Sequence, residues 1–142
     1  MSFDLPAATY SYLERSAASL REAIIDTDAG MRYAHAHIAA LRATAALLAA
    51  RATPSVPRRG RPAQRNAWTL LAEIAPEFTE WAAFFSSGAA KRAAAEAGSR
   101  RAVTEREADD LVRDADRFLG LVEESLGLRR HVPVPETITF AS

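Results

Sequence analysis

The stretch TEREADDLVRDADRFLGLVEESLG, residues 104–127, decides the fold. Thr104 and Glu107 have the spacing of a capping box, in which each side chain bonds the backbone N–H of the other residue. Gly127 suits the position just after a helix end. The apolar residues between them recur at helical spacing: Ala108, Leu111, Val112, Ala115, Phe118, Leu119 and Val122. Because the opposite face is charged, the stretch predicts an amphipathic helix packed against a core.

Two further helices are predicted upstream, over residues 6–25 and over a segment that follows Asp28 and ends near Arg51. Asp28 is a good N-cap residue. Each segment has an apolar stripe at intervals of three and four. The stripes are Leu13, Ala17, Leu20 and Ile24 in the first helix, and Ala34, Ile38, Leu41, Ala45 and Leu48 in the second. We expect both stripes to face the core.

A third helical segment is predicted from about residues 62–66 to Phe85, where Pro76 either kinks the helix or opens a new one. Its apolar positions cover about half of the circumference, so this segment must contact neighbours on two sides. Trp81, Phe84 and Phe85 form the predicted packing or dimer face. Helical character continues to Gly98, which we interpret as the residue after a helix end.

These elements predict an all-α protein, a four-to-five-helix up-and-down bundle. Residues 1–27 hold the first helix, which packs on the bundle, and residues 28–127 form the bundle itself, with a basic loop at 53–64. The loop is rich in proline and arginine, which excludes a helix. Residues 128–142 carry two prolines and no periodic face, so we expect an extended or disordered tail.

The chain has 142 residues, no cysteine and a net charge of zero. Disulfides, thiolate zinc sites and a cysteine nucleophile are therefore excluded. Neither a signal peptide nor a membrane-spanning run is recognisable, so we expect a soluble, cytoplasmic protein. The charge is uneven, since seven arginines and no acid lie between Asp28 and Glu73, whereas acids dominate residues 104–124. Such asymmetry is typical of a partner-binding face or of attraction between two copies.

The run RYAHAH, residues 32–37, is the first candidate for chemistry. An arginine that holds a phosphate and a histidine that moves a proton are sufficient parts for metal-free RNA cleavage. On a helix Arg32 and His37 point about 140° apart, so Arg32 and His35 are the better geometric pair. His37 borders the apolar stripe, and a structural role with a satisfied hydrogen bond is the preferred interpretation. We expect no metal site, because the histidines lack ligand spacing.

The loop arginines Arg58, Arg59 and Arg61, together with Arg65, are candidate phosphate or nucleic-acid ligands. Aromatic residues for base stacking are not interleaved among them, so a solubilising loop is the alternative. The acids Asp110 and Asp114 lie on one helix face and suit a solvated charge lattice better than a metal pair. No phosphate-binding or hydrolase motif is present, which argues against an ordinary metabolic enzyme and leads us to expect no cofactor.

The runs RYAHAHIAALRATAALLAAR, RNAWTLLAEIAPEFTEWAAFF and AVTEREADDLVRDADRFL resemble the HEPN superfamily over residues of roughly 28–126. The closest resemblance is to a small HEPN family of unassigned role from GC-rich bacteria. The resemblance implies a helical bundle that usually dimerises, and often a metal-independent ribonuclease or toxin. The family's Arg-Asn pair would be Arg65 and Asn66. The histidine expected five to seven positions after Arg65 is missing, since 70–72 are Leu, Leu and Ala.

Three functions follow from the sequence and the resemblance. The leading hypothesis is a dimeric binding or regulatory module of the HEPN type without catalytic activity. The rival is a metal-independent ribonuclease or toxin that uses Arg65 and Asn66, with a histidine supplied from elsewhere. The third is a nucleic-acid-binding protein that works through the arginine loop. The partners implied are a second copy, RNA or a nucleotide, and a cognate antitoxin-like protein, but no membrane.

Overall fold

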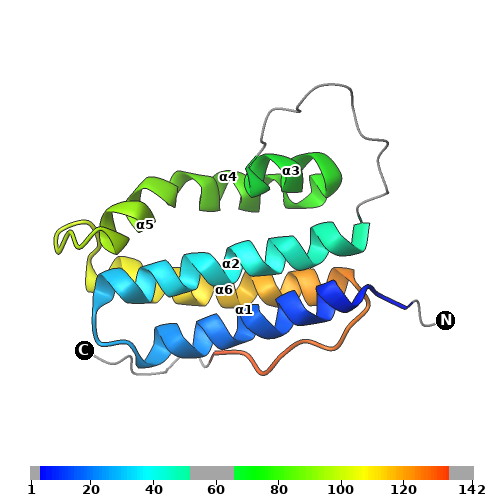
Figure 1. Cartoon of the computed structure of the whole chain (residues 1–142), viewed down its shortest axis with the longest axis horizontal. Helices are drawn as coiled ribbons and strands as arrows, with labels where there is room; N and C mark the ends of the chain where they lie inside the picture. The colour runs from blue at the N-terminus through cyan, green and yellow to red at the C-terminus, as the bar shows by residue number, and fades with distance from the viewer. Residues whose placement is uncertain (1–3, 52–65, 135–142) are drawn as a thin grey trace.

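A computed structural model describes residues 4–51 and 66–134, and all regular structure in these ranges is helical. The elements are α1 (Ala7–Ile25), α2 (Ala29–Arg51), α3 (Ala67–Ile74), a 3-10 turn (Pro76–Phe78), α4 (Thr79–Ser87), α5 (Ala89–Glu96) and α6 (Glu105–Ser125). α1, α2 and α6 are long and nearly parallel in axis, and α3 to α5 form a broken fourth leg above them (Figure 1). The predicted up-and-down bundle is therefore confirmed.

Local signals set the ends of these helices. The capping box of Thr104 and Glu107 is present in both directions, with N···O distances of 3.0 and 3.1 Å. Gly98 and Gly127 follow α5 and α6 with φ of +96° and +74°, a conformation that glycine adopts without strain. Pro76 begins the 3-10 turn and so separates α3 from α4. Of the two outcomes predicted for Pro76, the break is the one observed.

The central element is α2, which is covered on most sides by α1, α6 and the α3–α5 leg (Figure 1). Of the stripe predicted for it, Ala34 is fully buried, but Ile38, Leu41, Ala45 and Leu48 are only partly buried. The side chains that are fully enclosed lie between them: Ala36, Ala39, Ala40, Ala43, Ala46 and Leu47. Small residues on most of its circumference let several helices approach α2 closely, and this explains why no single apolar stripe marks its core face.

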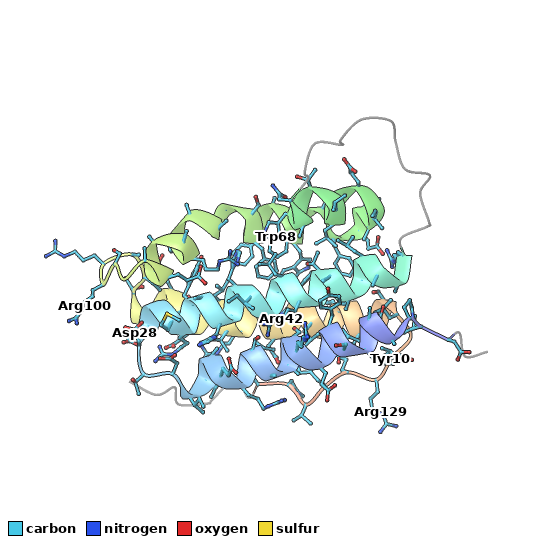
Figure 2. The ribbon with its side chains drawn as sticks, in the orientation of Figure 1. Tyr10, Asp28, Arg42, Trp68, Arg100 and Arg129 are labelled. Atoms are coloured by element: carbon cyan, nitrogen blue, oxygen red, sulfur yellow. The ribbon has the colours of Figure 1, made fainter. Side chains whose placement is uncertain are left out.

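α1 joins α2 through small polar side chains as well as apolar ones. Thr9 donates a hydrogen bond to the carbonyl of Ala46 at 3.0 Å, and Ser16 donates one to the carbonyl of Ala39 at 2.7 Å. Arg42 of α2 reaches back to the Ser19 hydroxyl at 2.7 Å (Figure 2). Because all three α1 hydroxyls are buried and bonded, they tie α1 to α2 without a desolvation penalty.

Candidate functional site

Arg32, predicted as a phosphate ligand, is buried inside the bundle with none of its surface exposed. Its Nη1 donates to Glu105 Oε2 at 2.8 Å and to Asp109 Oδ1 at 2.9 Å, both on α6, and its Nη2 donates to the Asp26 carbonyl at 3.1 Å. A buried guanidinium needs such compensation, because an uncompensated charge in a core is strongly destabilising. The positive charge of Arg32 is therefore used to join α2 to α6.

His35, the partner predicted for Arg32, lies near two other carboxylates. Its ring nitrogens are 3.4 Å from Glu22 Oε2 and 3.5 Å from Asp26 Oδ2. Arg32 and His35 thus both contact Asp26, one through its carbonyl and the other through its side chain. Four carboxylates lie around the pair, Glu22 and Asp26 beside His35, Glu105 and Asp109 beside Arg32. Their negative charge disfavours a phosphate at this position.

His37 points away from Arg32, as its helical spacing predicts, and is almost fully buried. Its Nε2 is 2.8 Å from the Phe85 carbonyl, and its Nδ1 is 3.3 Å from Arg92 Nη1. A carbonyl only accepts and a guanidinium only donates, so the ring carries its proton on Nε2 and accepts at Nδ1. Burial lowers the pKa of His37 and Arg92 lowers it further, against the bond to Phe85. His37 therefore joins α2 to α4 and α5 as an uncharged side chain.

Aromatic rings enclose His37. Trp68 of α3 meets it edge-on at 5.6 Å between ring centroids, and Phe85 of α4 does so at 6.3 Å. Tyr33 stacks at 6.5 Å. Phe85, which was predicted as part of a packing or dimer face, is fully buried in this cluster, as a packing residue would be. A structural role for His37 with a satisfied hydrogen bond fits these contacts, although the residue lies within the core and not at its border.

Asn66, the second residue of the pair suggested by the family resemblance, caps α3. Its Oδ1 accepts from the backbone N–H of Thr69 at 2.9 Å and from the Thr69 hydroxyl at 3.1 Å. Arg65 and the predicted loop ligands Arg58, Arg59 and Arg61 lie outside the described residues. Capping an orphan N–H stabilises a helix start, so Asn66 has a structural use independent of any ligand.

Trp81 and Phe84 are the other two residues of the predicted packing or dimer face. Trp81 is partly buried, and Phe84 is 44% exposed. Together with Glu80 and with Asp114 of α6 they line a hollow of about 300 Å³. Burial raises the pKa of the Asp114 carboxyl and Asp110 adds to this, whereas Arg117 opposes it.

A buried cluster at the C-terminal end of the described chain was not predicted. His131 Nδ1 is 2.6 Å from Glu123 Oε1, and His131 Nε2 is 2.6 Å from Asp116 Oδ1. Burial disfavours protonation of His131, but the two carboxylates outweigh it and raise its pKa. Asp116 and Glu123 are seven positions apart, and this spacing on one helix face was the available sequence signal. His131 thus holds residues 128–134, here called the C-terminal strap, against α6.

Within residues 4–51 and 66–134, no group of three or more histidine or acidic side chains is arranged to hold a metal ion. The same ranges contain no helix long and apolar enough to cross a membrane.

The comparison with protein-family models identifies a family for most of the chain. The family model described as SAV_6107-like HEPN matches residues 23–123, which include α2 to α5 and most of α6. Searches of curated proteins and of solved structures find no match.

Proposed function

The chain belongs to the SAV_6107-like HEPN family, and on that premise we propose that it is a binding or regulatory module of the HEPN type without ribonuclease activity. The observation that carries the proposal is the use of Arg32 and His37 within the fold. Arg32 is buried against two carboxylates, and His37 is buried between a carbonyl and an arginine. Neither is placed to hold a scissile phosphate or to exchange a proton with solvent.

The experiment is an RNA cleavage assay without divalent metal. Purified protein is incubated with a labelled single-stranded RNA in the presence of a chelator, next to Arg65→Ala and Asn66→Ala. We expect all three proteins to leave the RNA intact. Metal-free cleavage by the natural chain that Arg65→Ala abolishes would refute the proposal and establish the ribonuclease alternative. Arg106→Ala is the matched control, because Arg106 is 92% exposed and makes only a long contact with Asp110.

Homodimerisation is part of the proposal, as the family resemblance implies. The large apolar side chains that are exposed in the described residues are Tyr10, Ile25, Phe84 and Val132. These four residues lie on three separate segments and do not form one large apolar patch. The apolar face on α4 consists of Phe84 and the exposed part of Trp81, and it is small. Stable dimers bury roughly 800 Å² on each partner. We therefore expect a dimer held at this face to be weak, and sedimentation velocity at several concentrations, with Phe84→Ser as the variant, measures it.

A further inference from the structure

The hollow between α4 and α6 is formed by rings that hold the two helices apart. Trp81 of α4 contacts Phe118 of α6 at 5.5 Å between centroids, and Phe85 contacts the same ring at 5.1 Å. Bulky rings between two helices keep their backbones separated, and the space beyond the rings stays open. Glu80, Trp81 and Phe84 line this space from α4, and Asp114 lines it from α6.

Two of its walls are aromatic and stand at a right angle. The rings of Trp81 and Phe84 are 6.4 Å apart between centroids, with an angle of 85° between their planes. The two rings thus form a corner of the hollow. The Trp81 ring is held in place by stacking on Phe85 at 5.8 Å between centroids. The faces of aromatic rings carry negative potential and attract cations that lie within about 6 Å.

The remaining walls are carboxylates. Glu80 is exposed at the rim, whereas Asp114 is only partly exposed. In the described part of the chain, no donor bonds to the Asp114 carboxylate. Its neighbours are Asp110, which repels its charge, and Arg117, which attracts it from the exposed surface. A partly buried carboxylate in this position gains from a cation that enters the hollow.

We propose that this hollow binds the guanidinium group of an arginine side chain presented by a basic segment of a partner protein. A guanidinium is planar, stacks on aromatic rings and donates two parallel hydrogen bonds to a carboxylate, so it suits a corner of two rings and two acids. A volume of about 300 Å³ admits one such side chain. The inference rests on the proposed function in that it gives the binding module a ligand. It assigns the hollow to the monomer, because a dimer held at Trp81 and Phe84 would cover the same residues.

Trp81 provides a direct readout. The chain has two tryptophans, and Trp68 is buried against His37. In a two-dimensional ¹H–¹⁵N spectrum the two indole N–H signals are assigned with Trp81→Phe, and N-acetyl-arginine methylamide is then titrated. We expect the Trp81 signal to shift in a saturable manner with a dissociation constant of about 1–10 mM, as for one side chain. The Trp68 signal serves as the internal reference, and sedimentation confirms a single species at the concentration used.

Three variants test the chemistry of the hollow. Asp114→Asn removes the buried charge, and we expect it to weaken binding about tenfold. Phe84→Leu keeps an apolar wall without the ring face and weakens binding about threefold. Arg117→Gln removes the competing guanidinium, so it strengthens binding about twofold. Glu14→Gln, an exposed acid on α1, leaves binding unchanged and controls for net charge. Far-UV circular dichroism confirms that each variant folds.

The alternatives give different results. Blocked lysine that binds as tightly as blocked arginine overturns the guanidinium assignment, and free arginine that binds much more tightly than the blocked form points to a free metabolite. A shift with blocked arginine no larger than with blocked glutamine, up to about 20 mM, overturns the site itself. None of these results depends on RNA cleavage, so the site and the proposed function fail separately.

Discussion

Replacing His131 with alanine is the sharpest test of how the C-terminal strap is held. Its ring joins two carboxylates of α6 at 2.6 Å each, and the side chains of Asp116 and Glu123 are 11% exposed. The backbone N–H of His131 also donates to Glu123 Oε1 at 3.0 Å, and that of Val134 donates to Asp116 Oδ2 at 3.1 Å. His131→Ala removes both ring bonds and leaves two nearly buried acids without the imidazole between them.

The magnitude follows from these contacts. A hydrogen bond to a charged group contributes about 1.5–3 kcal/mol. The two bonds do not add fully, because the strap can detach and admit water to both acids. We therefore expect His131→Ala to lower the free energy of unfolding by about 2–3 kcal/mol. At about 4 °C per kcal/mol for a domain of this size, Tm falls by roughly 8–12 °C.

The effect depends on pH in a defined direction. The pKa of His131 is raised in the folded protein, and that of an unfolded histidine is about 6.5. A raised pKa stabilises the fold fully below about pH 6.5, and the stabilisation is lost as pH rises through the folded value. The other charged groups at the strap are Arg21 of α1, which lies beside it, and Arg130, which donates to Glu124 through Nε at 2.9 Å. The difference between natural chain and variant is therefore larger at pH 6 than at pH 9.

The assay is thermal unfolding followed by circular dichroism at both pH values. His35→Ala is the matched control, since its ring lies 3.4 and 3.5 Å from two acids in a more exposed setting. We expect that variant to lose no more than about 1 kcal/mol. Equal losses for His131→Ala and His35→Ala, or a loss for His131→Ala that is the same at pH 6 and pH 9, would show that the reasoning is wrong.

Three further predictions concern the bundle and are measured by urea unfolding. Arg32→Met leaves the two α6 carboxylates without their cation and lowers the free energy of unfolding by about 3 kcal/mol. Arg32→Lys keeps the positive charge but not the planar guanidinium, so it lowers the free energy of unfolding by less. Gly88→Ala places a Cβ against the Tyr33 hydroxyl and costs about 1–3 kcal/mol, much of which Tyr33→Phe restores in the double variant. Thr104→Ala breaks the capping box and costs about 1 kcal/mol, with no recovery by Glu107→Gln.

The parts of the fold that were predictable depend on neighbours close in sequence. A capping box, a proline and a glycine in the left-handed region each act within a few residues, and Thr104, Pro76 and Gly98 set helix ends where the sequence placed them. The core face of α2 was not predictable in the same way. A helix rich in alanine and enclosed by several neighbours has little contrast between its faces, so an apolar stripe does not identify its core.

The ion pairs of Arg32 could not be predicted because they join residues far apart in sequence. Arg32 lies 73 and 77 positions from its two acids. On the sequence alone an arginine near the start of a helix is equally consistent with an exposed ligand and with a buried cation. Only the packing of α6 against α2 decides between them.

α1 and the C-terminal strap lie on the same side of α6. The family match ends at residue 123 and begins at residue 23, so nearly all of α1 and the whole strap lie outside it. α1 packs on α2 and α6, and the strap runs along the same side (Figure 1). α1 and the strap do not cover the side of α6 on which Asp114 lines the hollow together with residues of α4. A partner that enters the proposed site would contact α6 at Asp114 and α4 at Trp81 and Phe84.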